Sequence, residues 1–468
     1  MKSKFIKRNT SERLILIFAG WGMDWRPFAM LDHPGYDLLV IWDYRELSFN
    51  WKPFFRYDEI CLIAWSTGVF AASVTIHEIE PRITLRIAVN GTLTPIDELH
   101  GIRPSLWRGL QNTLSPGTLK KYQRRICNSQ KQYEFLKENS PRRTIADLKE
   151  ELEAFETHTI FHVEQMNRWD MAIVGQHDAI FPFPNQLEAW KGVAPVRMFD
   201  SGHFPDLRQL LTRLIIDKDL VSRRFTDAYK SGRGDSRLSE LIGSELMNYF
   251  RNSFDEENIV GNVIEVGCGA RGVLTRMWYP HTDRRAKLLL WDIAEVETAG
   301  FAPSGVFERC DAETRIRRQQ PESARFIFSS SAIEWFNSPK EFLKECCRVL
   351  VPGGYLVVSS FIAGSLEELV SVTGKGLQMH TLRGWQKSIP AEMEILVCET
   401  EKITLSFDEP RQVLEYLRDA GVNAVRFGQS GAALARKLLR EYPVDGDSGN
   451  YRLTFCPVYI VARKNGDD

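Results

Sequence analysis

The first half of the chain carries three residue types that together perform nucleophilic catalysis, in the order serine, aspartate, histidine. Ser66 stands in the turn of the segment LIAWSTGV, Asp178 follows the apolar run MAIVG, and His203 ends the segment FDSGH. A serine hydroxyl attacks a carbonyl when an imidazole accepts its proton and a carboxylate stabilises the imidazolium that forms. These residues predict cleavage of an ester or a related acyl compound, with Ser66 as the nucleophile.

Other residues compete for these roles. Asp170 and Asp200 are alternative acids, and His177 lies directly beside Asp178 in the sequence. A serine at a turn is also a common helix cap, and Ala64 replaces the first glycine of the G-x-S-x-G pattern. The order of the three residues, and their positions after predicted strands, favour the catalytic interpretation.

The tetrahedral intermediate of ester cleavage carries an oxyanion, which needs two aligned N–H donors. Thr67 follows the serine directly, and its backbone N–H is the first candidate. The loop Gly20-Trp21-Gly22 follows the first predicted strand, and the N–H of Trp21 is the second candidate.

A glycine-rich loop in the second half predicts a nucleotide-type ligand. Gly267, Gly269 and Gly272 follow the apolar run VIEV, and Asp292 ends the run LLLWD 20 residues after Gly272. Glycines in this pattern let a ligand approach the backbone, and an acid at this distance binds ribose hydroxyls. A dinucleotide and S-adenosyl-L-methionine both fit these positions.

Four further residues favour S-adenosylmethionine. Glu265 precedes the first glycine, where methyltransferases carry an acid. Asp311 and Ala312 follow a third predicted strand, where such enzymes hold the adenine, and Ser329 lies near the end of the strand ARFIFSS. We expect these residues, with Gly267, Gly269 and Asp292, to line the cofactor site.

Alternating elements predict the scaffold that positions both sites. In the first half, apolar runs begin near residues 14, 37, 59, 83, 171 and 196, with helical segments between them. Such alternation predicts a parallel sheet whose loops at the carboxyl ends of the strands carry function. Residues 95–165 interrupt the strands and predict a helical lid. The predicted domains are 1–218 and, after a polar segment, 219–468.

Composition excludes several classes. The 468 residues are 43% hydrophobic and 26% charged, as in ordinary globular proteins. A net charge of −1 predicts no nucleic-acid partner. No apolar run is long enough to span a membrane, and eight scattered cysteines without a C-x-x-C pair predict neither a metal site nor disulfides. We expect a cytoplasmic protein.

The predicted lid has an unusual charge. Residues 100–143 hold ten Lys or Arg and two acids, a formal excess of eight positive charges. A charge run is often only a solvated helix face, but aromatic residues interleave here and predict a packed element that binds an acidic partner. The first candidates for docking are Arg103, Arg108, Lys120, Lys121, Arg124 and Arg125.

The two halves resemble two known families. The segments FAGWGMD, AWSTGV, NGTLTPID and FDSGHFP resemble BioG-type pimeloyl-ACP methyl ester esterases over residues 10–215. This resemblance implies an α/β-hydrolase with Ser66 as nucleophile, His203 as base and Asp178 as acid. The segments VIEVGCGARG, FSSSAIEWF and GSLEEL, with GVNA at 421–424, resemble class I methyltransferases of the malonyl-ACP (BioC) type over 222–464. Ala270 and Arg271 depart from that pattern, where Thr-Gly is common.

Together the resemblances imply a bifunctional enzyme of biotin-precursor synthesis, an α/β-hydrolase followed by a Rossmann-like methyltransferase. It would methylate malonyl-ACP and hydrolyse pimeloyl-ACP methyl ester, with acyl carrier protein as partner. Tyr229, Arg233, Arg237 and polar residues near Ser330 are candidates to orient the malonyl carboxylate. Two alternatives are a general carboxylesterase fused to a small-molecule methyltransferase, and a non-catalytic module before an active methyltransferase.

Overall fold

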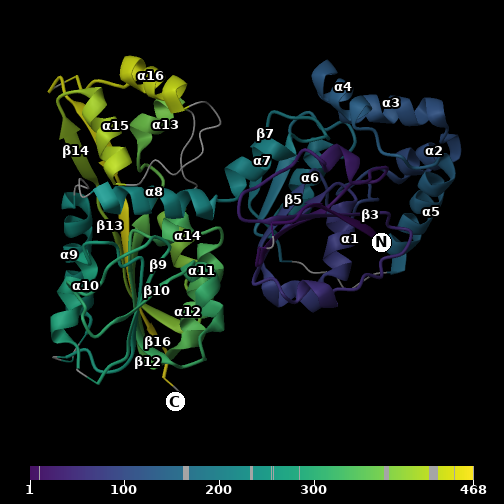
Figure 1. The fold of residues 1–468 in the computed structure, drawn as a ribbon. Coiled ribbons are helices and arrows are strands. Elements are labelled where there is room, and N and C mark those ends of the chain that lie inside the picture. The colour runs from purple at the N-terminus through teal and green to yellow at the C-terminus, as the bar shows by residue number, and fades with distance from the viewer. Residues whose placement is uncertain are drawn as a thin grey trace. The chain divides into compact units, whose positions relative to one another are not determined.

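In this computed structural model the chain divides into two compact units, Met1–Leu214 and Ile215–Asp468 (Figure 1). The structure describes residues 1–9, 11–161, 168–231, 236–254, 256, 258–283, 285–373, 379–420, 431–446 and 448–466. Each unit has its own sheet and its own apolar core.

The N-terminal unit is built on a seven-stranded sheet with the order β1-β3-β2-β4-β5-β6-β7. Only β1 runs antiparallel to its neighbour. Side chains of β2, β3, β4 and β5 are almost all buried, as expected for parallel strands covered on both faces. The strands are Lys2–Lys7, Arg13–Phe18, Asp37–Trp42, Glu59–Trp65, Ile83–Val89, Met171–Gly175 and Val196–Phe199. The covering helices are α1 (Gly68–Thr75), α6 (Phe183–Trp190) and α7 (Leu207–Leu214).

Four helices lie between β5 and β6 and form the helical insertion: α2 (Pro104–Thr113), α3 (Pro116–Ile126), α4 (Gln130–Glu138) and α5 (Ile145–Phe161). α3 begins at a capping box in which the side chains of Ser115 and Thr118 each accept from the other's backbone N–H. Arg143, just before α5, binds Glu151 of α5 at 2.5 Å and Asp43 after β3 at 3.2 Å. These buried ion pairs attach the insertion to the sheet.

The C-terminal unit has a second seven-stranded sheet with the order β10-β9-β8-β11-β12-β16-β13. β8 to β12 are mutually parallel, whereas β16 is antiparallel to both β12 and β13. The strands are Val263–Val266, Leu288–Asp292, Val306–Arg309, Ala324–Ser330, Leu350–Phe361, Met393–Thr400 and Pro457–Lys464. The parallel part has the Rossmann-like arrangement expected for a methyltransferase.

Helices cover this sheet, and a small two-stranded sheet is appended (Figure 1). The helices include α8 (Lys218–Ser231), α9 (Arg237–Asn252), α10 (Val273–Trp278), α11 (Ala312–Arg315) and α12 (Pro339–Val349). The appended layer holds β14 (Ile403–Phe407), β15 (Tyr451–Phe455), α13 (Glu367–Thr373), α15 (Pro410–Asp419) and α16 (Gly431–Glu441). Both units are therefore α/β, as the alternation of strands and helices predicted.

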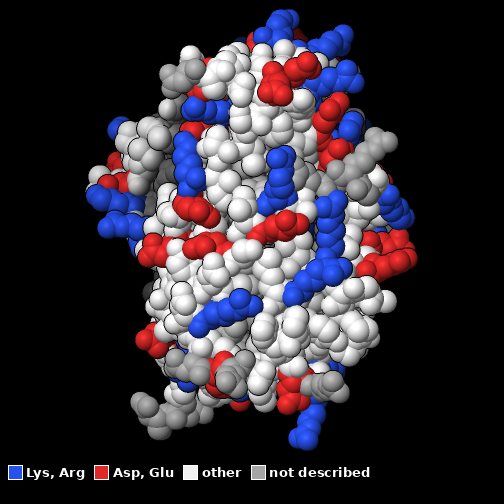
Figure 2. Space-filling view, turned by 90° about the vertical axis from the view of Figure 1, so that its left-hand side faces the viewer, with Lys and Arg blue, Asp and Glu red and all other residues white. Residues whose placement is uncertain are grey.

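The surface shown in Figure 2, which faces left in Figure 1, carries basic and acidic side chains interspersed with one another. No extended area of one charge sign is visible on this face. Within the described ranges, no helix combines the length and the apolar character that crossing a membrane requires.

Candidate active sites

Ser66 occupies a strained turn between β4 and α1. Its φ of 59° lies in the left-handed region, which is uncommon for a residue with a side chain. Glycines on either side make this turn possible: a Cβ on Gly68 would lie 2.5 Å from the Phe18 carbonyl oxygen, and one on Gly91 would lie 2.3 Å from the Ser66 carbonyl oxygen. The turn has the geometry of a nucleophile elbow, and Ala64 is accommodated as a buried residue of β4.

The structure brings Ser66, His203 and Asp178 into one hydrogen-bonded chain. The His203 Nε2 atom lies 3.0 Å from the Ser66 Oγ atom, and His203 Nδ1 lies 2.9 Å from Asp178 Oδ2. Asp178 also accepts a hydrogen bond at 3.0 Å from the amide of Gln186, which orients the carboxylate. All three members are buried, so water does not weaken these interactions.

The competing residues have other partners. Asp170 accepts a hydrogen bond at 2.8 Å from the backbone N–H of Arg86. Asp200 forms an exposed pair with His177, at 3.0 Å. Of the three aspartates that the sequence offered as the histidine's partner, the structure therefore brings Asp178 to His203.

The predicted oxyanion loop lies against the serine. A Cβ on Gly20 would approach the Ser66 Oγ atom to 3.4 Å. The backbone N–H groups of Trp21 and Thr67 donate no hydrogen bond to any described residue, although both residues are buried. Two unpaired N–H groups beside a serine hydroxyl are what a developing oxyanion requires.

The helical insertion packs directly on this loop. The Trp21 indole N–H donates to the Leu148 carbonyl of α5 at 3.1 Å, and the Trp21 ring meets the Tyr122 ring of α3 edge-on, with centroids 5.0 Å apart. Ser66 is 1% exposed. The insertion therefore controls the surroundings of the serine.

In the C-terminal unit the glycine loop joins β8 to α10. Gly267, Gly269 and Gly272 have φ values of 73°, 64° and 53°, all in the left-handed region that favours glycine. A Cβ on Gly267 would lie 2.5 Å from the Ala332 Cβ, and one on Gly272 would lie 2.2 Å from the Phe301 ring. The loop thus requires glycine and leaves backbone open to a ligand.

Asp292, Asp311 and Ala312 line a small cavity of about 70 Å³ beside this loop. Asp292 accepts from the Gly269 N–H at 2.9 Å, and burial raises the pKa of its carboxyl to about 6. Asp311 caps α11 and lies 3.3 Å from the buried Lys218 ammonium group, which also binds Glu313 at 2.8 Å. Asp292, at the end of β9, is suited to bind ribose hydroxyls, and Asp311, after β10, is suited to bind adenine.

Glu265 and Ser329 face away from the cavities. Glu265 accepts from Thr275 Oγ1 at 2.7 Å and from Trp278 Nε1 at 2.6 Å, and burial raises the pKa of its carboxyl to about 8. Its Oε1 atom has no hydrogen-bond partner in the described structure. Ser329 donates to the Val266 carbonyl at 3.0 Å. The next two serines, Ser330 and Ser331, lie on the cavity wall instead, and for Ser330 the alternation of a strand could have indicated this.

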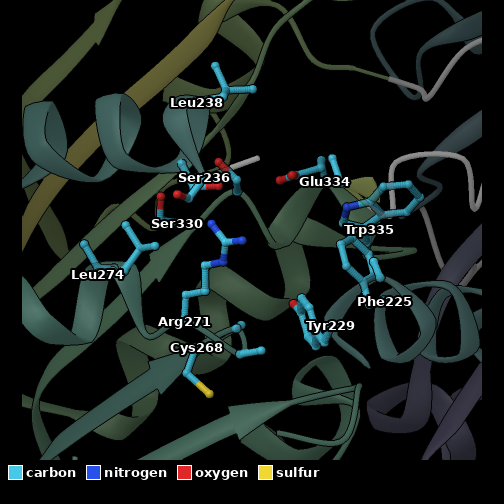
Figure 3. Close-up of a pocket in the computed structure, with 18 of the residues that line it drawn as sticks. Phe225, Tyr229, Ser236, Leu238, Cys268, Arg271, Leu274, Ser330, Glu334 and Trp335 are labelled. Atoms are coloured by element: carbon cyan, nitrogen blue, oxygen red, sulfur yellow. The ribbon is translucent and has the colours of Figure 1, made fainter. Parts of the chain in front are cut away.

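A larger cavity of about 400 Å³ lies over the glycine loop (Figure 3). Tyr229, one candidate for the malonyl carboxylate, lines it, but Arg237 is not on its wall, and Arg233 falls outside the described residues. Sequence reasoning missed Glu334 as a wall residue and noted Arg271 only as a departure in the loop.

The two cavities share part of their walls, including Gly267, Tyr229, Ser331 and Trp335. A ligand can thus extend from the acids of the small cavity across the glycine loop into the larger one. The residues present fit an elongated nucleoside such as S-adenosylmethionine.

Comparison with known proteins places each half in a family. Residues 1–211 match the family model described as pimeloyl-ACP methyl esterase BioG, and residues 264–358 match a methyltransferase domain. The crystal structure of BioG from Haemophilus influenzae aligns with 32% sequence identity and a TM-score of 0.41, covering 44% of this chain and 96% of that chain.

Relatives extend over one or both halves. A malonyl-(acyl-carrier protein) O-methyltransferase of Bacteroides thetaiotaomicron is 29% identical and covers 53% of this chain and 99% of its own length. An O-methyltransferase of the same description from Bacteroides fragilis is 31% identical over 465 residues, 96% of this chain and 92% of its own. The present chain therefore belongs to the malonyl-(acyl-carrier protein) O-methyltransferase family, in the form in which a BioG-type domain precedes the methyltransferase domain.

Proposed function

We propose that the chain both adds and removes a methyl ester during synthesis of the pimeloyl precursor of biotin. The C-terminal unit methylates the free carboxylate of malonyl-ACP, and the N-terminal unit, an α/β-hydrolase whose helical insertion is the lid, hydrolyses pimeloyl-ACP methyl ester. The hydrogen-bonded chain from Ser66 through His203 to Asp178 is the observation that carries the hydrolase proposal. Family membership and the glycine-loop cavities support the methyltransferase proposal.

Ester hydrolysis follows in two steps. The Ser66 oxygen bonds to the ester carbonyl carbon while His203 Nε2 takes the hydroxyl proton, and the oxyanion is stabilised by the N–H groups of Trp21 and Thr67. The imidazolium then returns its proton to the departing methoxy oxygen, and methanol leaves. Water repeats the sequence on the acyl-enzyme and releases the carboxylic acid and the free serine.

Methyl transfer needs little acid–base help from the protein. A malonyl carboxyl group, with a pKa of about 4, is already ionised at neutral pH. Its oxygen forms the new O–C bond, while the C–S bond of the sulfonium donor breaks and leaves its electron pair on sulfur. The contribution of the residues around the cavity is to align the carboxylate and to exclude water from it.

The two activities on one chain have a physical rationale. A free carboxylate is costly to move into an apolar tunnel, whereas its methyl ester is not. Methylation would let the malonyl group enter chain elongation as an ordinary acyl group. Hydrolysis would restore the carboxylate once the chain has reached pimeloyl length.

The acyl carrier protein, which is acidic in the family's reactions, would dock on the basic face of the lid. Lys120, Lys121, Arg124 and Arg125 fall on one side of α3, are exposed, and form no ion pair with any described residue. Arg103 and Arg108 lie 3.9 Å from Glu98 and 3.4 Å from Glu156, so their charges are already partly compensated. The face of α3 is therefore the strongest part of the proposed docking surface.

Mass spectrometry on the full chain tests the proposal directly. Wild-type protein with S-adenosylmethionine should add one methyl group to malonyl-ACP, and without it should release methanol from pimeloyl-ACP methyl ester. Ser66→Ala should lose only the second reaction. Absence of either wild-type reaction would reject the corresponding half of the proposal, and a Ser66 that an organophosphonate cannot label would indicate a non-catalytic module.

A further inference from the structure

An exposed, positively charged side chain, that of Arg271, lines the larger cavity of the C-terminal unit. Arg271 belongs to the glycine loop, and Figure 3 shows its side chain reaching into the middle of the cavity between Cys268 and Ser330. Its guanidinium group makes no hydrogen bond or ion pair with any residue in the described part of the chain. The backbone oxygen of Arg271 accepts a hydrogen bond from Arg276 Nε at 3.0 Å.

Glu334 lies across the same cavity but does not neutralise this charge. Figure 3 shows its carboxyl group on the opposite wall, where it accepts a hydrogen bond at 3.2 Å from Ser360 Oγ. Burial raises the pKa of this carboxyl to about 8, so at neutral pH it is protonated for most of the time. A neutral carboxylic acid can donate a hydrogen bond as well as accept one.

The other titratable groups on the cavity wall do not neutralise the positive charge of Arg271. The Asp419 carboxylate is already bound by Arg418 at 2.9 Å. Burial holds the pKa of Cys268 and of Tyr229 well above their ordinary values, so both stay neutral. Tyr416 is the remaining titratable wall residue. Among the wall residues that the structure describes, the cavity therefore combines the Arg271 guanidinium, neutral hydrogen-bonding groups and the Asp419 carboxylate that Arg418 already binds.

We propose that Arg271 and Glu334 together recognise the free carboxylate of the acceptor, an acyl group with carboxyl functions at both ends. The guanidinium supplies the opposite charge in a geometry that matches a carboxylate. Glu334 supplies a hydrogen-bond donor where an ionised acid would repel the ligand. The inference rests on the proposed methyltransferase function and names the residues that select its substrate.

The donor also carries a carboxylate, at its methionine end, so the two sources must be separated. Binding can be measured without turnover by calorimetry on the full chain. S-adenosylhomocysteine reports the donor site, and monoethyl malonate, added to protein saturated with S-adenosylhomocysteine, reports the acceptor carboxylate.

Arg271→Gln should weaken monoethyl malonate binding, and raise the KM for malonyl-ACP, by roughly 10-fold or more. The affinity for S-adenosylhomocysteine should stay within about 2-fold of wild type. Weakened S-adenosylhomocysteine binding would assign Arg271 to the donor and overturn the proposal, as would unchanged monoethyl malonate binding. Because the two calorimetric affinities need no turnover, unlike the KM, they remain decisive even if malonyl-ACP is not methylated. Absence of methylation would instead reject the proposed function.

Glu334 gives the proposal a pH signature. Below about pH 8 its carboxyl is neutral and assists binding, whereas above this value it ionises and repels the ligand. Affinity for monoethyl malonate should therefore fall as pH rises from 7 to about 9. Glu334→Gln keeps a donor and cannot ionise, so it should bind with a flat profile. The control Glu295→Gln, at an exposed residue outside both cavities that pairs with Lys230, should keep the wild-type profile. A Glu334→Gln profile that falls like the wild type would overturn the role of Glu334.

Discussion

At the scale of single residues, the geometry of the serine site depends on neighbouring residues as well as on Ser66, His203 and Asp178. Gly68 and Gly91 allow the left-handed turn at Ser66, because any side chain there would collide with backbone. Asn90 anchors the histidine loop by donating to the carbonyl of His203 at 2.9 Å. Such supporting contacts hold reacting groups within hydrogen-bonding distance.

Replacing Asp178 by Asn should abolish most of the hydrolase activity without unfolding the protein. The Asn side chain would no longer stabilise the imidazolium, and its amide would favour the wrong tautomer of His203. We expect kcat for ester hydrolysis to fall by roughly 10³–10⁴-fold. Steady-state kinetics on pimeloyl-ACP methyl ester measure this effect. Asp200→Asn is the matched control, because Asp200 is exposed and its ion-pair partner in the described part of the chain is the exposed His177. It should keep wild-type kcat.

At the scale of elements, α3 has two faces with different tasks. One face presents four cations to solvent, and another places Tyr122 against the Trp21 ring of the oxyanion loop. α3 therefore links the proposed docking surface to the proposed oxyanion loop.

Reversing charge on α3 should weaken binding of the carrier-bound ester and leave the chemistry intact. For Lys120→Glu/Lys121→Glu/Arg125→Glu we expect KM for pimeloyl-ACP methyl ester to rise about 10-fold or more at low salt, with a weaker salt dependence. Hydrolysis of a small soluble ester should stay within about 2-fold. A control with the same change in net charge is Lys52→Glu/Lys149→Glu/Lys191→Glu. Equal effects of the two triple variants would contradict docking on α3.

We expect attachment of the helical insertion to the sheet to depend on Arg143. This arginine is buried with Glu151, whose carboxyl pKa burial raises, and with Asp43, which also binds Arg45 at 2.9 Å. Arg143→Met would leave the Glu151 charge buried without its partner and should cost about 3–5 kcal/mol of stability. Adding Glu151→Gln should recover much of this loss. Urea unfolding followed by hydrogen exchange in α5 measures both, and a cost below about 1 kcal/mol would contradict this role.

At the scale of the whole molecule, each active site lies within one compact unit with its own core. We therefore expect the two half-reactions to be separable in the full-length chain. Ser66→Ala should abolish ester hydrolysis and leave methyl transfer within about 2-fold. Gly267→Ala should do the reverse, because its Cβ would collide with Ala332 at 2.5 Å. Separate assays on malonyl-ACP and on pimeloyl-ACP methyl ester test this, and loss of both activities in either variant would refute it.

Under the proposed function, the chain must also avoid hydrolysing the malonyl methyl ester that it forms. We expect the hydrolase to prefer the pimeloyl over the malonyl methyl ester by roughly 10²-fold or more in kcat/KM, since each added methylene in a fitted apolar pocket contributes to discrimination. Competition between the two carrier-bound esters measures this ratio. Equal rates would mean that another step protects the malonyl ester.

The amino-acid sequence by itself determined the α/β class, the order of serine, acid and histidine, and the glycine loop with its following acids. These features depend on local patterns: apolar runs form buried strands, and turns that need a left-handed backbone require glycine. The edge strand β1 was not predicted, because KSKFIK is too charged to resemble a buried strand and pairs only at the margin of the sheet.

Only the tertiary structure decided where side chains point and which ones meet. Glu265 turns inward to Thr275 and Trp278, and Ser330 rather than Ser329 reaches the cavity, because strand pairing fixes which face each side chain takes. Arg271 comes from the glycine loop and Glu334 from the short 3-10 helix Ile333–Trp335, and they share a cavity only in the folded unit. Sequence patterns fix the local conformation of a segment, but charge compensation and pKa depend on the neighbours that packing brings from distant parts of the chain.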